Sequence, residues 1–140
     1  MPVLHLGVVD VPYTEGGQTT AEVAQILEDK YHIIEIFFEQ KKELIERILT
    51  ASVESSLQAV LMGSPSREPF GNAGQDIETL FREFLLTSEM EGLGYPGVPT
   101  GAALKGISHR FAHPYAKSNP RRPSFIDTGL YEDSFRAWVD

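Results

Sequence analysis

The sequence predicts an α+β fold, in which two amphipathic helices cover a small, mainly antiparallel sheet and long loops join the elements. Extended, β-rich runs stand near the N-terminus, in the middle and at the C-terminus, and they would form the sheet. Two other segments repeat apolar residues at helical spacing, and they would cover it. With 140 residues and 41% apolar content, the chain suits a single domain, residues 1–140, with one core.

The N-terminal part predicts a strand and then a helix. Residues 3–9 form a β-rich run that ends before Asp10 and Pro12, as an opening strand would. Thr19 stands three residues before Glu22, the spacing at which a hydroxyl and a carboxylate cap each other's free backbone amides. We therefore expect a helix over residues 20–29.

The middle of the chain predicts an extended segment and a long helix. Residues 32–38, HIIEIFF, are rich in β-branched and aromatic residues and suit a strand or an extended arm. From residue 40 to residue 62 the apolar positions recur at helical spacing, which indicates a long amphipathic helix. Its stripe consists of Leu44, Ile45, Ile48, Leu49, Leu57, Val60 and Leu61. That stripe would pack on the chain's own sheet or, alternatively, seat a helix of a partner.

Loops and shorter helices follow. Residues 63–75 are rich in Gly, Pro, Ser and Asn and predict a mobile loop, after which Asp76 would begin a second amphipathic helix. Thr100 and Gly106 flank a short helix as its N-cap and as the glycine beyond its end. Residues 107–122 predict a second mobile loop.

The chain ends in a turn and a strand-like segment. Asp127 or Thr128 would cap a short turn, Gly129 would allow a tight approach, and Leu130 would point inward. Residues 134–139 then alternate, so that Arg136 and Trp138 lie opposite the apolar face. Such a strand would pair with the N-terminal strand or complete a sheet on the next subunit.

Charge is divided unevenly along the chain. Residues 1–97 contain sixteen acidic and six basic residues, whereas residues 98–126 contain five basic residues and no acidic one. The five are Lys105, Arg110, Lys117, Arg121 and Arg122. This basic segment would be a contact surface or a solvated loop that offsets the acidic remainder.

No catalytic, metal or cofactor site is expected. The chain has no cysteine, and the pair His109 and His113 lacks the glutamate of the H-E-x-x-H zinc motif. GLGYPG lacks the lysine of a phosphate-binding loop, and no serine stands in a nucleophile elbow. The start lacks a secretory signal and the apolar runs are shorter than a bilayer span, so we expect a soluble protein made in the cytosol and no membrane partner.

Several short motifs occur in a recognisable order. They are LHLGVVDVPYTEGG, TTAEVAQILED, the pair Phe37 and Phe38, the long helix, PTGAALKG and the IDTG turn with the strand after it. In this order they resemble the tail-completion or head–tail joining proteins in the neck of tailed, lambdoid and Mu-like bacteriophages. The chain departs from that pattern at residues 27–30 and at Ile36, where relatives often have a proline.

The resemblance implies a structural protein of the virion, without catalysis or a cofactor. Its partners would be further copies in a closed ring, expected to be a hexamer, and other neck, portal-side or tail proteins. DNA would pass through the ring without specific binding. The protein would be assembled into the particle in the cytoplasm of the bacterial host. The expected contact residues are Phe37, Phe38, Lys105, Arg110, Lys117, Arg121, Arg122, Arg136 and Trp138. The alternatives are a small nucleic-acid-binding regulator that uses residues 105–122 and a small hydrolase of unrecognised type.

Overall fold

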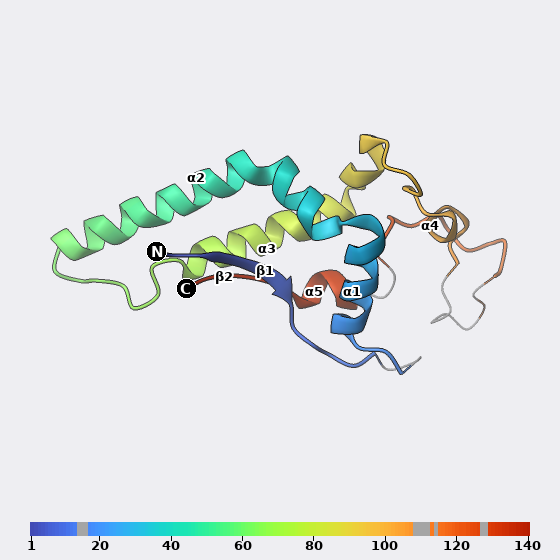
Figure 1. Cartoon of the computed structure of the whole chain (residues 1–140), viewed down its shortest axis with the longest axis horizontal. Coiled ribbons are helices and arrows are strands. Elements are labelled where there is room, and N and C mark those ends of the chain that lie inside the picture. The colour runs from blue at the N-terminus through green and yellow to red at the C-terminus, as the bar shows by residue number, and fades with distance from the viewer. Residues whose placement is uncertain (14–16, 108–112, 114, 127–128) are drawn as a thin grey trace.

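The computed structural model describes residues 1–13, 17–107, 113, 115–126 and 129–140 (Figure 1). The elements in chain order are β1 (Leu4–Val8), α1 (Thr20–Tyr31), α2 (Ile33–Leu61), α3 (Gly71–Leu86), the 3-10 helix η1 (Glu89–Leu93), α4 (Gly101–Lys105), α5 (Leu130–Ser134) and β2 (Phe135–Val139). A small antiparallel sheet combined with several helices confirms the α+β class.

The sheet joins the two ends of the chain. β1 and β2 are antiparallel, with Leu6 opposite Ala137 and Val8 opposite Phe135. Both terminal strands were predicted, and of the two alternatives for the C-terminal strand the structure has the pairing within the chain's own sheet. The predicted strand from the middle of the chain does not join them.

That middle segment is helical, so the prediction of an extended run over residues 32–38 is wrong. His32 has a left-handed backbone, with φ 54°, and separates α1 from α2. Ile33, Ile36 and Phe37 then lie on one face of α2 and are buried. Burial of that face outweighs the β preference of the individual residues, which is a weak determinant beside packing.

The second long helix also begins earlier than predicted. α3 starts at Gly71 rather than at Asp76, so residues 71–75 of the predicted loop belong to the helix. Gly71 and Gly74 suggested a loop, but Gly74 lies where α3 crosses β2. A Cβ there would overlap the carbonyl oxygen of Ala137. The glycine thus permits a close contact between helix and strand.

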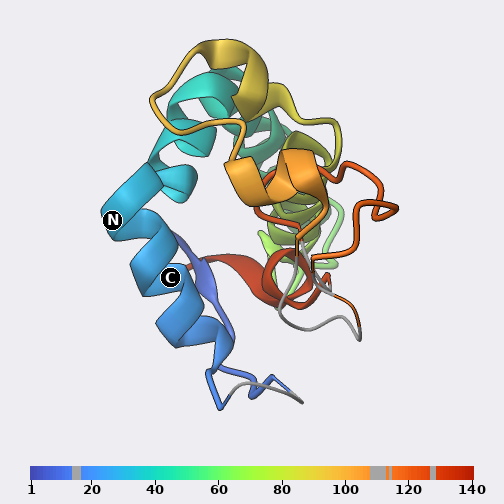
Figure 2. The ribbon, with the colours of Figure 1, turned by 90° about the vertical axis from the view of Figure 1, so that its right-hand side faces the viewer.

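The core is built from aromatic rings where α2, α3 and β2 meet. Phe81 stacks on Phe135 with 3.9 Å between the ring centroids, and Phe37 lies edge-on to both, at 5.2 and 5.9 Å. All three side chains are fully buried. In Figure 2, which looks along the molecule, α3 and the sheet lie beneath α2.

The shorter helices have the predicted caps. Thr19 and Glu22 form the reciprocal capping box of α1. The hydroxyl of Thr100 accepts the N–H of Ala103 at the start of α4, and Gly106 ends it with φ 65°. Both helices therefore begin where the sequence predicts.

Candidate assembly surfaces

The C-terminal turn and strand match the prediction where they are described. Gly129 is left-handed, with φ 88°, and directly precedes α5. Leu130 is half-buried, and Phe135 and Ala137 face the core opposite the exposed Arg136 and Trp138. Asp127 and Thr128 lie outside the described residues.

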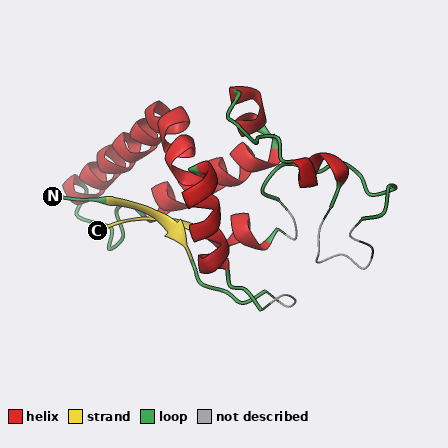
Figure 3. Ribbon diagram, turned by 45° about the vertical axis from the view of Figure 1, so that its right-hand side comes forward, coloured by secondary structure: helices red, strands yellow, loops and turns green. Residues whose placement is uncertain are grey.

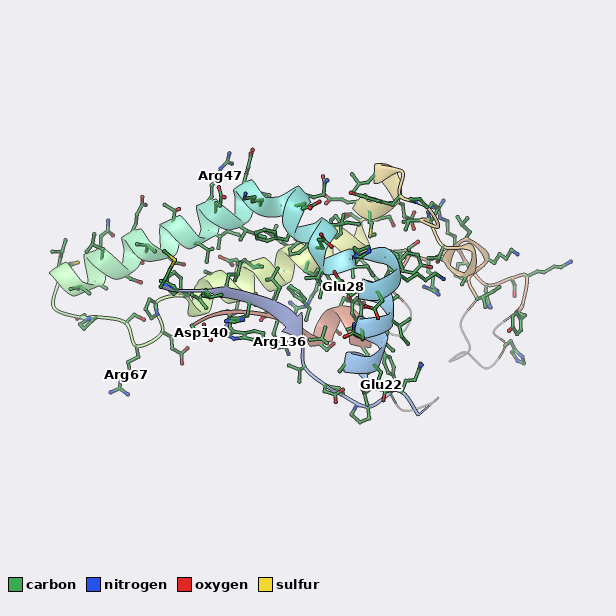
Figure 4. All side chains as sticks on the ribbon, viewed as in Figure 1. Glu22, Glu28, Arg47, Arg67, Arg136 and Asp140 are labelled. Carbon is green, nitrogen blue, oxygen red and sulfur yellow. The ribbon has the colours of Figure 1, made fainter. Side chains whose placement is uncertain are left out.

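The outer face of the sheet carries a small cluster built on Trp138. The indole ring stacks on His5, with centroids 5.2 Å apart and planes inclined by 12°. The Nε2 atom of His5 lies 2.9 Å from Oδ1 of Asp140. Arg136 donates to the carbonyl oxygens of Asp133 and Phe135, and Figure 4 shows Arg136 and Asp140 along this sheet. Trp138 is about half exposed and remains available to a partner.

The paired phenylalanines have different positions. Phe38 is partly exposed, but Phe37 is fully buried against Phe81, Phe84 and Phe135. The expectation that Phe37 contacts a partner is therefore wrong, because its ring is part of the chain's own core.

Two arginines of the basic segment are engaged within the chain. The Nη2 atom of Arg121 lies 2.6 Å from Oε2 of Glu91. Arg122 donates to the carbonyl oxygens of Ile126, at 2.6 Å, and Ile107, at 3.1 Å, and is only partly exposed. Arg122 thus holds the turns of its own loop, and it is not a free surface charge.

Glu91 is the acidic partner that organises this segment. Besides Arg121, it accepts hydrogen bonds from the backbone N–H of Ser124, at 3.0 Å, and from its hydroxyl, at 2.8 Å. Burial by itself would raise the pKa of Glu91, but the hydrogen bonds from Ser124 and the nearby Arg121 outweigh it, so the pKa is lowered. Glu91 therefore ties η1 to residues 121–124.

The remaining bases of the basic segment are two lysines and Arg110. Lys105 and Lys117 are exposed, whereas Arg110, like His109, lies outside the described residues. Arg121 and Arg122 are engaged within the chain, so two exposed lysines remain. They are a weak footprint for nucleic acid, which needs clustered bases on one face.

The far half of α2 is an exposed apolar arm. Figure 1 shows this end of the helix extending past the sheet. Ile45 is buried and Ile48 and Leu49 are half-buried, but the later apolar side chains are exposed. These are Val53, Leu57, Val60 and Leu61, with exposed fractions of 51, 59, 57 and 78%. We call these four residues the arm face.

The prediction for α2 is therefore confirmed for only part of its stripe. The near half packs on the chain itself, and the far half does not. One signal in the sequence sets the two halves apart, because residues 50–62 contain a single charged residue, Glu54. An apolar helical surface with so little charge is typical of an interaction site.

One group of side chains at the junction of α1 and α2 has a spacing that would suit a metal ion. Ligand atoms of Glu28, His32 and Glu35 lie within 4.8 Å of one another. Both carboxylate oxygens of Glu28, however, already accept backbone N–H groups, from Ile34 at 2.9 Å and from Glu35 at 3.1 Å. These N–H groups lie in the first turn of α2, where a helix leaves its donors unpaired, so Glu28 acts as a cap.

A cleft of about 250 Å³ lies between α1 and the segment that leads to α5. Its walls are largely aromatic and aliphatic and include Leu27, Tyr31, Phe125 and Tyr131. Tyr131 is buried, and its hydroxyl has no hydrogen-bond partner among the described residues. Burial raises the pKa of this phenol.

Comparisons with protein-family models, with curated proteins and with solved structures found no match. Within the described part of the chain, no helix is long and apolar enough to cross a membrane.

Proposed function

We propose that this protein is a structural subunit of a tailed bacteriophage particle, and that copies of it form a closed ring at the head–tail junction. The observation that carries the proposal is the arm face of α2. Four exposed apolar residues on one projecting helix give the chain a surface that a partner would cover. The ordered sequence motifs, from the opening strand to the IDTG turn, favour the phage neck as the place of that contact.

A closed ring requires two different faces of the subunit to be complementary, so that each copy contacts the next in the same way. The arm face would be one of them. The Trp138 cluster, on the outer face of the sheet, adds a partly exposed aromatic of the type enriched at interfaces. A six-fold ring would match a hexameric tail tube.

DNA would pass through this ring without specific binding. The chain has a net charge of −8, and acidic side chains on the wall of a channel would repel phosphates. Lys105 and Lys117 would then meet acidic surfaces of a neighbour, where complementary charge steers docking. The nucleic-acid alternative has less support, because Arg121 and Arg122 are engaged within the chain.

The test is a phage that carries Leu57→Lys in this protein. The substitution places a charge in the middle of the arm face without touching a buried residue, so the fold should persist while the contact is lost. We expect unjoined heads and tails in the lysate and a fall in infectious particles. Electron microscopy of the wild-type particle should show the protein as a ring in the neck.

Gln58→Lys is the matched control, because it adds the same charge at the adjacent exposed position of α2. It should leave head–tail joining unchanged. Equal yields for the two variants, or a particle without this protein in its neck, would contradict the proposal.

A further inference from the structure

The hydrogen-bond ladder assigns a direction to each backbone group of the sheet. Val3 and Asp140 exchange both N–H···O bonds, at 2.8 and 3.1 Å. Because paired residues alternate in an antiparallel ladder, Leu4, Leu6 and Val8 direct their N–H and C=O groups away from β2. They form the outer edge of β1. Phe135, Ala137 and Val139 form the outer edge of β2 in the same way.

The edge of β2 is closed by α3. The backbone N–H of Ala137 donates to Oε1 of Glu78, at 3.2 Å. Its carbonyl oxygen lies against Gly74, where a Cβ would not fit. A further strand therefore has no access to β2 at this point.

The edge of β1 is open. Among the described residues, none forms a hydrogen bond with the outward backbone groups of Leu4, Leu6 or Val8. α1 contacts β1, and just beyond the strand Thr20 forms hydrogen bonds with the backbone of Val9 and Val11. In Figure 3 the arrowhead of β1 lies beside α1.

This edge also lacks the features that usually prevent pairing. Exposed strand edges in soluble proteins are commonly protected by lysine, by proline or by a bulge. β1, with the sequence LHLGV, contains none of these residues, and its register with β2 is continuous. The outward backbone groups of β1 can therefore pair with another strand.

We propose that β1 pairs with β1 of a second copy of this chain, antiparallel and about a two-fold axis at Leu6. Leu6 would face Leu6 of the second copy, and Leu4 would face Val8. Each of these pairs would exchange both N–H···O bonds, so that every outward group of β1 has a partner. The two sheets would become one that crosses the dimer.

Two copies of β1 are complementary in this register and poorly complementary in the neighbouring registers. A slip by one residue would turn the apolar side chains to the wrong face. A shift by two in one direction brings Val8 opposite Pro2, which has no N–H, and in the other direction it brings Leu4 opposite Asp10, which lies beyond the end of the strand. A second copy is therefore an occupant that matches the whole edge.

The side chains also suit this pairing. Leu4, Leu6 and Val8 are half-buried on the core side, and a second copy would bury them further. On the outer side His5 would face Gly7 of the second copy, beside the Trp138 ring that lies over that glycine. No like charges face each other within the paired strands. This contact concerns the free protein and does not depend on the proposed role in the phage neck, because it leaves the arm face of α2 uncovered.

Cysteine pairing tests the register directly, because the chain has no cysteine of its own. Residues 5 and 7 of the two copies would form a non-hydrogen-bonded pair with Cα atoms about 4.5 Å apart, within the range of a disulfide. We expect a mixture of His5→Cys and Gly7→Cys proteins to yield mainly the mixed disulfide dimer on mild oxidation. Crosslinking of each variant with itself as readily as with the other would overturn the register.

The mass of the protein in solution is the second test. Light scattering during gel filtration should show twice the chain mass for the wild type, with dissociation on dilution. Leu6→Pro removes an N–H that β1 does not use in its own sheet, so this variant should be monomeric and folded by circular dichroism. Leu6→Ala, the matched control for the lost side chain, should still dimerise. A wild type that is monomeric at every concentration would overturn the proposal, while the effect of Leu57→Lys on the phage would still test the neck role separately.

Discussion

Tyr131 carries a buried hydroxyl for which the described residues provide no partner. An unsatisfied buried polar group typically costs about 1–3 kcal/mol. We expect Tyr131→Phe to raise the free energy of unfolding by an amount in this range, because the ring would keep its contact with Phe81, 6.0 Å between centroids. Urea denaturation of the two proteins measures the difference. A loss of stability would show that the hydroxyl is hydrogen-bonded in solution.

Glu91 makes stability depend on pH in the acid range. Its pKa in the folded protein is lowered from the ordinary 4.5, so the unfolded chain takes up a proton first as the pH falls. The contribution of Glu91 is complete above the unfolded pKa and is lost as the pH falls through the folded one. We expect Glu91→Gln to be less stable than the wild type at neutral pH and the difference to shrink below about pH 4.5. Denaturation at a series of pH values checks this, and a constant difference would contradict it.

At the scale of single residues, the sequence showed where charged and apolar side chains stand but not which residues they contact. The acid-free segment was visible in the sequence, but the ion pair between Arg121 and Glu91 joins residues 30 positions apart. Only the folded chain brings them together. The buried position of Phe37 was hidden for the same reason, since its neighbours lie on α3 and β2.

Among the elements, the crossing of α3 and β2 depends most on a single residue. A side chain at Gly74 would overlap the backbone of Ala137, and backbone cannot move aside as a flexible side chain does. We expect Gly74→Ala to lower the free energy of unfolding by about 1–3 kcal/mol, the usual cost of overpacking, despite the better helix propensity of alanine. Gly92→Ala is the control, because no atom lies within 4 Å of a Cβ there, and it should change stability little. Equal stability of the two variants would show that the crossing adjusts.

Local signals in the sequence predicted the elements whose ends they mark. The capping box at Thr19 and the caps of α4 are short-range features, and both were found as predicted. The start of α2 was missed because its cap comes from Glu28, on the preceding helix, and because the turn between the helices is formed by His32 rather than by glycine. The start of α3 was missed because Gly74 serves packing and not a turn.

The whole molecule consists of a packed body and a projecting arm. Aromatic packing joins α2, α3 and β2 in the body, whereas the arm face beyond Leu49 is largely in solvent (Figure 1). The sequence predicted one continuous amphipathic helix. It could not show where packing stops, because that depends on how far α3 and the sheet extend beneath α2.

This division predicts a gradient of amide protection along α2. Segments with few buried contacts open locally at a smaller free energy than the core. In the free protein, amides of residues 33–49 should exchange as slowly as those of α3, while amides of residues 53–61 should exchange faster. Hydrogen exchange read by mass spectrometry measures both parts. Uniform protection along α2 would show that the arm is already covered in the free protein, whereas protection of residues 53–61 that appears only in phage particles would assign the arm face to the assembled neck.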